Sequence, residues 1–374
     1  MKFICTKENL SHTLAAVSGV AGKNISLPIL GNVLIKASEQ KVEMLTTNLE
    51  VAVISQLRAK IEAPGAFTVP ARTLNDFVNL LSDEKVELSL NGSELEVVCG
   101  KTATKIKGSP ADEFPLLPAV TEGKGFTLDA EILKRGLDQV SQSASKNEIR
   151  PELSGILFDF NNDKPGYLTL AATDSYRLAE KKIKLAQGEE KVKIIVPGRT
   201  TQELSRVLAL IGGFETEKST RLMINENQIV LRYNDVEVIS RLIEGQYPDY
   251  TQIIPREFKT TAEFSTSQLA KEIKAAGIFT TTGINAITFD LKPEQSLVAI
   301  SSASTQTGDH KSELSADVKG EQNSILLNHR YVLDGLNNME TDATQLKVIN
   351  GDSPCVLSPK GDDSYLYIVM PIRQ

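Results

Sequence analysis

Apolar residues along the chain alternate between helical spacing and strand spacing, and the same order of patterns occurs three times. In each copy a short apolar run ends in an arginine and is followed by apolar residues at helical spacing, such as i, i+3, i+4 and i+7. These arginines are Arg72, Arg199 and Arg330, and they lie about 130 residues apart. The pattern predicts one helix after each arginine.

An alternating apolar pattern, typical of antiparallel strands, follows each predicted helix. Residues 86–90 alternate up to Asn91-Gly92, and the alternation resumes at 95–97. Residues 346–348 lead into Asn350-Gly351 in the same way. Because a type I′ turn needs positive φ at both central residues, Asn-Gly between such runs predicts a β-hairpin.

The half of each copy that precedes the arginine also repeats. It opens with a short strand at Phe3, Phe126 or Phe264, continues with a helical triplet and returns to an apolar strand. Chance could supply one match, but five landmarks in register over three periods indicate a threefold repeat. The predicted class is therefore α+β, with three repeated domains that each pack two helices on antiparallel sheets. The predicted domains are residues 1–121, 126–253 and 261–374.

Composition narrows the class of protein. At 374 residues the chain is long enough for two or three domains of about 150 residues. Hydrophobic residues make up 41% and charged residues 24%, which excludes intrinsic disorder, and no apolar stretch reaches the roughly 18 residues of a membrane helix. No signal-peptide core follows the N-terminus, and three widely spaced cysteines (Cys5, Cys99 and Cys355) argue against a disulfide framework. We therefore expect a cytoplasmic protein.

Candidate catalytic and metal-binding motifs do not meet the requirements of their chemistry. The three histidines lack zinc-ligand spacing, and Gly100-Lys101-Thr102 cannot end a phosphate-binding loop because position 95 is leucine rather than glycine. A calcium-loop pattern that starts at Asp159 lacks its glycine and its final glutamate. We therefore expect no catalytic residues, metal ligands or cofactors, and we predict that the protein is not an enzyme.

Two alternatives stay open at this point. A carboxylate pair that serves an enzyme could be hidden among the 48 acidic residues. A tandem array of three similar domains without a catalytic set is also typical of a protein-interaction scaffold, which need not meet DNA.

Several short motifs occur in order from Met1 to Gln374. They are Met1-Lys2-Phe3, Leu27–Asn32, Val69–Arg72, Thr173–Leu178, Tyr247–Tyr250 and Met370–Arg373. Together they closely resemble the beta subunits of bacterial DNA polymerase III, the DNA sliding clamps. The resemblance implies a processivity factor of DNA replication, in which a head-to-tail homodimer of three-domain subunits closes into a ring around duplex DNA. It also implies that the ring slides without sequence specificity and is associated with the bacterial nucleoid during replication.

The chain as a whole is acidic, so it suits a ring around DNA only because its charges are unevenly distributed. The net charge is −7, which by itself argues against a nucleic-acid partner, yet the predicted helices carry slightly more basic than acidic residues. Because topology retains a closed ring on DNA, weak and sequence-independent phosphate contacts suffice. By resemblance, the DNA-contacting residues are Lys23, Asn24, Arg72, Lys146, Arg150, Arg199 and Arg206.

The resemblance also implies two protein-binding surfaces. The replicative polymerase, the clamp loader and repair proteins are expected to dock short peptides with apolar anchors between the second and third domains. The peptide-binding residues would be Leu153, Thr173, Ser175, Tyr176, Arg177, Leu178, Pro248, Ile253, Asn328, Tyr331, Met370, Pro371, Ile372 and Arg373. The dimer interface would join Lys101 and Thr104 of one subunit to Ile278 and Phe279 of the other.

Overall fold

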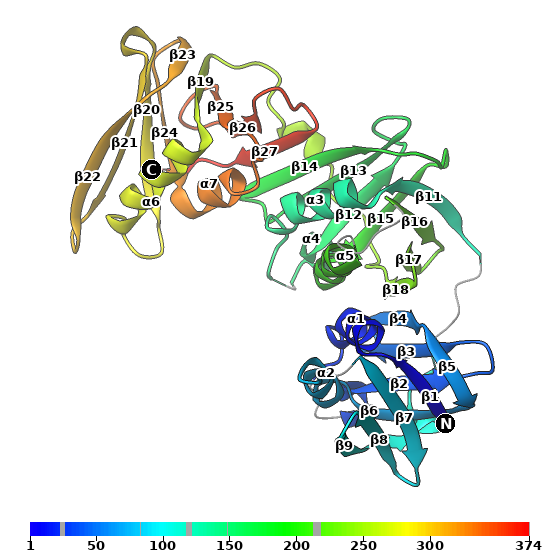
Figure 1. The fold of residues 1–374 in the computed structure, drawn as a ribbon. Helices are drawn as coiled ribbons and strands as arrows, with labels where there is room; N and C mark the ends of the chain where they lie inside the picture. The colour runs from blue at the N-terminus through cyan, green and yellow to red at the C-terminus, as the bar shows by residue number, and fades with distance from the viewer. Residues whose placement is uncertain (23–26, 83, 117–121, 148, 212–217, 374) are drawn as a thin grey trace. The chain divides into compact units, whose positions relative to one another are not determined.

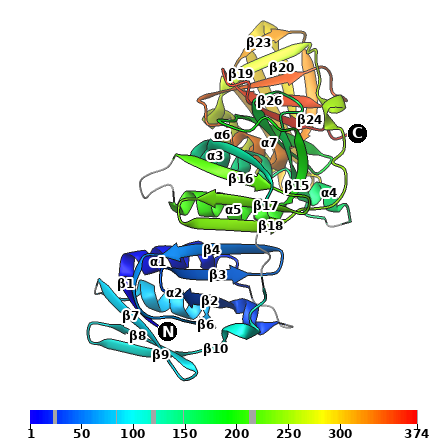
Figure 2. The same ribbon diagram turned by 90° about the vertical axis from the view of Figure 1, so that its right-hand side faces the viewer.

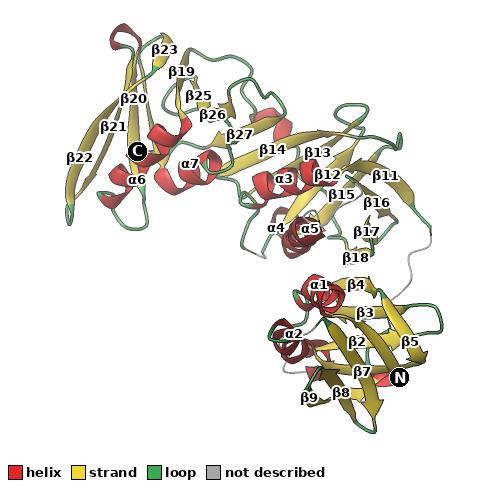
Figure 3. Cartoon of the chain, in the orientation of Figure 1, coloured by secondary structure: helices red, strands yellow, loops and turns green. Residues whose placement is uncertain are grey.

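Short helices lie against antiparallel sheets throughout the computed structural model (Figure 3). The structure describes residues 1–22, 27–82, 84–116, 122–147, 149–211 and 218–373. They form two compact units. The first unit contains Met1–Lys134, Leu185–Glu190 and Arg199–Leu242, and the second contains Arg135–Lys184, Lys191–Gly198 and Ile243–Gln374.

The first unit is built on one long sheet and one short sheet, both antiparallel. In spatial order, the long sheet contains β10 (Ser109–Pro110), β6 (Gly65–Pro70), β2 (Asn32–Ala37), β3 (Val42–Thr47), β4 (Val51–Leu57), β18 (Val236–Arg241), β17 (Gln228–Tyr233), β16 (Ser219–Ile224) and β11 (Lys124–Asp129). The short sheet contains β5 (Ala59–Ala63), β1 (Lys2–Thr6), β7 (Lys85–Asn91), β8 (Glu94–Cys99) and β9 (Thr102–Lys107). Because β4 pairs with β18, the long sheet joins strands of the first and second predicted domains.

Helices α1 (Lys7–Ser18) and α2 (Ala71–Asn79) pack against each other, and α1 lies on β3 and β4 (Figures 1 and 2). Thr6 begins α1 as its N-cap, since its hydroxyl accepts a hydrogen bond from the Asn9 backbone N–H. The apolar stripe predicted for α1 is buried, with Leu10, Leu14 and Val17 fully inside the core. Helix α5 (Gly198–Ile211) follows β15 (Val192–Pro197).

The second unit also holds one long and one short antiparallel sheet. The long sheet contains, in order, β15, β12 (Gly155–Phe160), β13 (Tyr167–Thr173), β14 (Arg177–Lys184), β27 (Tyr365–Val369), β26 (Cys355–Pro359), β25 (Ala343–Val348), β19 (Thr260–Ser265) and β23 (Asp317–Gly320). The short sheet contains β22 (Gly308–Ser315), β21 (Leu297–Ser304), β20 (Ala286–Lys292) and β24 (Asn323–Asn328). Here the pairing of β14 with β27 joins strands of the second and third predicted domains.

Helices α6 (Thr266–Ile278) and α7 (His329–Leu336) pack against each other in the second unit. The remaining helices are α3 (Ala130–Ser141) and the short α4 (Pro151–Ser154), and the 3-10 helices are η1 (Pro28–Gly31), η2 (Ala111–Glu113), η3 (Tyr250–Ile253) and η4 (Pro293–Gln295). The predicted α+β class is confirmed: each repeat supplies two principal helices to antiparallel sheets, and α4 is an addition that the apolar pattern did not predict.

Two further features match the expected local chemistry. The hairpin predicted at Asn91-Gly92 joins β7 and β8, and Gly92 adopts a φ of 62°. Cys5, Cys99 and Cys355 are buried, and none of the three forms a disulfide. Within the part of the chain that the structure describes, no helix is long and apolar enough to cross a membrane.

Candidate functional site

The turn between β13 and β14 is the centre of the predicted peptide surface. The Thr173 hydroxyl donates to the Arg177 carbonyl at 2.7 Å and accepts from the Ser175 N–H at 3.1 Å. The Asp174 carboxylate accepts from the N–H groups of Tyr176 and Arg177 at 2.9 and 3.0 Å. These bonds hold Ser175 at a φ of 76°, a conformation that is costly for any residue with a side chain.

The C-terminal segment lies against this turn. Beyond the pairing of β27 with β14, the Met370 N–H donates to the Tyr176 carbonyl at 2.9 Å. The Ile372 N–H donates to the Leu326 carbonyl, also at 2.9 Å. Met370, Pro371 and Ile372 are half-buried and Arg373 is exposed, so the segment is attached at both ends rather than projecting from the last strand.

Arg177 is the most constrained charged group of this surface. Only 7% of the residue is exposed, and its guanidinium pairs with Asp174 (Nε to Oδ2, 3.1 Å) and with Asp334. Burial opposes the positive charge, but the side chains of Tyr367, Asp334 and Asp174 outweigh it and raise the pKa of Arg177. The guanidinium also lies over the Tyr331 ring, 4.7 Å from its centroid.

An aromatic pair lies beside Arg177. The rings of Tyr176 and Tyr331 are stacked, with centroids 6.4 Å apart and an interplanar angle of 22°. Tyr176 is 63% exposed, whereas Tyr331 is half-buried, and this burial raises the pKa of Tyr331. Asn328 supports the pair indirectly, because its side chain accepts from the Arg330 N–H and caps the helix that carries Tyr331.

An apolar floor completes the surface. Leu178 is fully buried and packs with Tyr250, which lies in η3 before the 40% exposed Ile253. Tyr247, next to the half-buried Pro248, accepts a hydrogen bond from the Thr173 N–H at its hydroxyl (3.1 Å), and burial raises its pKa. The result is a mostly apolar surface with a few oriented polar groups, which suits an extended peptide with hydrophobic anchors.

Nearly all of the predicted peptide-binding residues are connected through these contacts and strands. Leu153 is buried at the end of α4, directly before β12, which is the neighbour of β13 in the sheet. Arg150, predicted to contact DNA, is exposed and pairs with Glu152 at 3.0 Å.

The sequence prediction missed four residues that hold this surface together: Asp174, Tyr247, Asp334 and Tyr367. Asp334 follows Tyr331 by three residues, and helical spacing could have placed both on one face of α7. The strand position of Tyr367, opposite Ala179, carried no comparable signal.

The predicted DNA-contacting residues have different environments. Arg72 and Arg199, in the first turns of α2 and α5, are exposed, and so is Lys146. Arg206 is half-buried, and its guanidinium donates to the carbonyls of Ala15 (2.8 Å) and Ala16 (2.6 Å). It also pairs with Glu203 at 2.7 Å. Lys23 and Asn24 lie outside the described residues.

The predicted dimer residues lie at or beside sheet edges in each unit. Lys101 is exposed before β9, and Thr104 lies on β9, the last strand of its sheet. Ile278, at the end of α6, is 68% exposed. Phe279 follows it and stacks on His310 of the edge strand β22, with ring centroids 5.7 Å apart.

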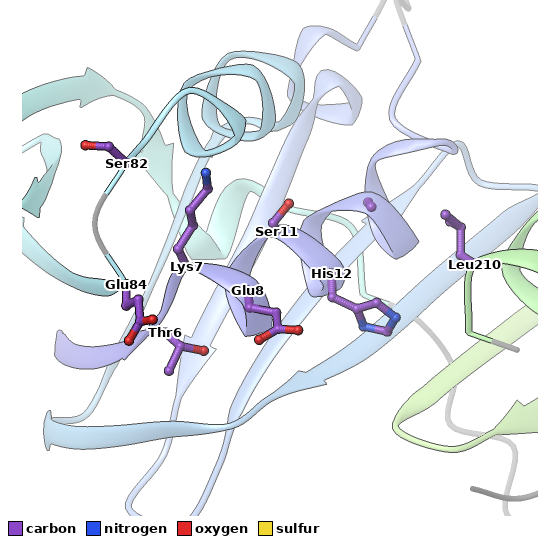
Figure 4. Close-up of a pocket in the computed structure, with 9 residues that line it drawn as sticks. Thr6, Lys7, Glu8, Ser11, His12, Ser82, Glu84 and Leu210 are labelled. Atoms are coloured by element: carbon purple, nitrogen blue, oxygen red, sulfur yellow. The ribbon is translucent and has the colours of Figure 1, made fainter. Parts of the chain in front are cut away.

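The first unit also has a cavity of about 520 Å³ on α1 (Figure 4). Side chains of α1 line one wall, and Ser82, Glu84 and Leu210 line the rest. The cavity lining contains both basic and acidic side chains, so its charge favours no particular class of ligand. Among the described residues, no group of three or more His, Cys, Asp or Glu side chains is placed to hold a metal ion.

Comparison with protein families gives three consecutive matches. The N-terminal, central and C-terminal domains of the DNA polymerase III beta subunit match residues 1–118, 127–249 and 251–373. The beta sliding clamp of Synechococcus elongatus is 31% identical over 378 residues, which cover 100% of this chain and 99% of that protein.

Solved structures give the same result. The DNA polymerase III beta subunit from Thermotoga maritima is 28% identical with a TM-score of 0.92, covering 100% of this chain and 99% of that chain. A sliding clamp from Pseudomonas aeruginosa bound to griselimycin is 25% identical with a TM-score of 0.92, covering 100% of both chains.

Proposed function

This chain belongs to the family of DNA polymerase III beta subunits, so its role is that of a processivity factor in DNA replication, and we propose that it acts as a homodimeric ring that encircles duplex DNA and tethers its partners by short peptides. The family is not catalytic, so the protein is not an enzyme. A scaffold that never meets DNA is not favoured, because the matching relatives and solved structures are sliding clamps of DNA polymerase.

The observation that carries the tethering role is the contact between the β13–β14 turn and the C-terminal segment. The bond from Met370 to Tyr176 and the pairing of β14 with β27 bring an apolar floor, an aromatic pair and a buried arginine onto one surface. We propose that the replicative polymerase, the clamp loader and repair proteins bind here through a peptide with a glutamine and two downstream hydrophobic anchors. The griselimycin complex of the Pseudomonas aeruginosa clamp supports ligand binding by a related protein.

The ring itself would close through sheet edges. Among the described strands, β9 pairs only with β8, and β22 pairs only with β21. Exposed Lys105 and Lys107 on β9 are opposite in charge to exposed Asp309 and Glu313 on β22, and exposed Lys311 lies between these two acids. Since unpaired edges invite pairing with another chain, a head-to-tail dimer would satisfy both edges at once.

DNA would be held by linkage and by weak phosphate contacts. Arg72 and Arg199 are exposed at equivalent positions of two repeats, each two residues after the proline that ends a strand. Such exposed cations suit sequence-independent contacts that do not stop sliding.

We further propose the domain limits 1–121, 126–253 and 261–374, and a location on the bacterial nucleoid during replication.

Retention on circular DNA tests the proposal. The protein, loaded on nicked circular duplex by a clamp loader, should stay bound at a salt concentration that abolishes its binding to short linear duplex, because topology and electrostatics are separate contributions. Cutting the circle once should release it. Release by salt alone, with no effect of the cut, would contradict a ring.

A further inference from the structure

Arg177 presents little surface to a ligand, because only 7% of the residue is exposed. Its guanidinium is paired with Asp174 and Asp334 and lies over the Tyr331 ring. Tyr367 also raises the pKa of Arg177, and the Tyr367 hydroxyl donates to the Tyr331 carbonyl at 2.9 Å. Two of these contacts lead to Tyr331, one to its ring and one, through Tyr367, to its backbone.

The turn that contains Arg177 does not need an arginine. The turn between β3 and β4 has the same hydrogen bonds: the Thr47 hydroxyl donates to the Val51 carbonyl (2.9 Å) and accepts from the Leu49 N–H (3.0 Å). Asn48 accepts from the N–H groups of Glu50 (3.0 Å) and Val51 (2.8 Å), as Asp174 does in the other turn. Leu49 has a φ of 76°, the same as Ser175.

Each turn also accepts a backbone hydrogen bond from the end of a strand of the next domain. The Arg241 N–H donates to the Glu50 carbonyl at 3.1 Å, just as the Met370 N–H donates to the Tyr176 carbonyl. Val51 occupies the place of Arg177 and is 2% exposed. A buried valine therefore satisfies the fold at this position, and the ion pairs of Arg177 are not required to form the turn.

We propose that Arg177 and Asp334 are positioning residues for peptide recognition, which hold Tyr331 against Tyr176, and that the exposed Arg373 is the group that meets an acidic residue of the peptide. The inference rests on the proposed peptide-binding function. In this view, Arg373 in the C-terminal segment determines the preference for a charged peptide. Arg177 instead keeps the apolar and aromatic surface in its shape.

The test uses two peptides with the same glutamine and hydrophobic anchors, one with an aspartate between them and one with asparagine. Calorimetric titration of the full-length protein would give both affinities. The double variant D174N/R177V, which copies the residues of the N-terminal turn, should weaken both peptides by the same factor, about tenfold or more. R373Q should weaken the acidic peptide by a larger factor than the neutral one.

A double-mutant cycle separates positioning from general damage. If Arg177 acts through Tyr331, R177V should have almost no further effect on affinity in a Tyr331→Leu background. If the two residues act independently, their fold-losses of affinity should multiply. Tyr331→Phe, which keeps the ring, should lose much less affinity than Tyr331→Leu. D334N removes one of the two carboxylate partners of Arg177, and as a milder variant it should weaken both peptides by a common factor that is smaller than the factor for R177V.

The outcomes are distinct. Three results would overturn the inference. R177V could lose affinity for the acidic peptide alone, or the losses of affinity in R177V and Tyr331→Leu could multiply in the double variant. The third is an R373Q variant that still prefers the acidic peptide. Failure of the wild type to bind either peptide would instead refute the proposed function. Thermal unfolding and solution mass of each variant would show that the turn and the subunit assembly are intact.

Discussion

A β-carbon added at Gly19 would lie 2.5 Å from the guanidinium of Arg206. Arg206 comes from α5, and Gly19 follows the end of α1 in the right-handed helical region. The absence of a side chain at Gly19 lets Arg206 donate to the carbonyls of Ala15 and Ala16 in the last turn of α1, where the helix dipole favours a positive charge.

The effect of Gly19→Ala should therefore depend on Arg206. In the wild type, displacing the guanidinium should lower the free energy of unfolding by about 1 kcal/mol, since a lost charged hydrogen bond outweighs the smaller entropic gain from alanine. In an Arg206→Ala background the same change should be stabilising by about 0.5 kcal/mol. Urea denaturation measures both. Gly22→Ala, where the nearest atom to the new β-carbon is the Val20 carbonyl at 3.8 Å, is the matched control.

Removing residues 370–374 should weaken peptide binding severely, by roughly thirtyfold or more, without affecting assembly. The deletion removes the half-buried Met370 and its bond to Tyr176, and one lost anchor contact at a hot spot costs about 2 kcal/mol or roughly thirtyfold in affinity. Strand β27 keeps its pairing with β14 and β26. Calorimetry with the neutral peptide measures the loss, and wild-type affinity would show that the segment is only the end of a strand.

Charged residues at Ile278 and Phe279 should convert the proposed dimer into a folded monomer. Ile278 is 68% exposed, and replacement of both apolar groups would place unpaired charges in the interface. Sedimentation or light scattering should give a mass near 40.8 kDa. Ile149→Lys, at a position that is 84% exposed outside the predicted interface, should leave the dimer unchanged.

Arg72→Ala and Arg199→Ala should each weaken binding to short linear duplex and make it less dependent on salt. Each lost phosphate contact should reduce the slope of log affinity against log salt by about one. Retention on circular DNA should change little, because linkage does not depend on these charges. An Arg206→Ala variant should lose less affinity for linear duplex than either, since its guanidinium is engaged with α1.

The stability of the protein should fall in mildly acidic solution partly through His329. Burial lowers the pKa of this imidazole, although its contact with the Asn285 carbonyl opposes the shift. The unfolded chain then binds a proton more readily than the folded one, so the contribution to stability is present above a pH of about 6.5 and is lost as the pH falls through the lower folded value. His329→Gln should flatten the dependence of Tm on pH between about 7.5 and 5.5. An unchanged profile would contradict this assignment.

Much of the fold could be predicted from local patterns. The stripe of Leu10, Leu14 and Val17 reports which face of a helix is buried, and Asn91-Gly92 reports a tight turn, because both depend on residues close in sequence. The repetition of such patterns three times was enough to predict three α+β domains. The family motifs also selected the residues of the β13–β14 turn, although their part in peptide binding stays a prediction.

The partners of those residues were decided by the tertiary structure. Arg177 meets Asp334 across 157 positions, and Arg206 meets Ala15 across 191, so neither contact leaves a periodic trace in the sequence. The same pattern after a strand introduces Arg72 and Arg199, whereas nothing in the sequence around Arg206 indicates that its guanidinium binds carbonyls of a different helix, α1. The sequence by itself determined which faces are buried and how often the domain repeats, since periodic burial is a local property. Only the packed sheets decided which charges are paired inside the protein and which remain for a ligand, because that choice depends on groups brought together from distant parts of the chain.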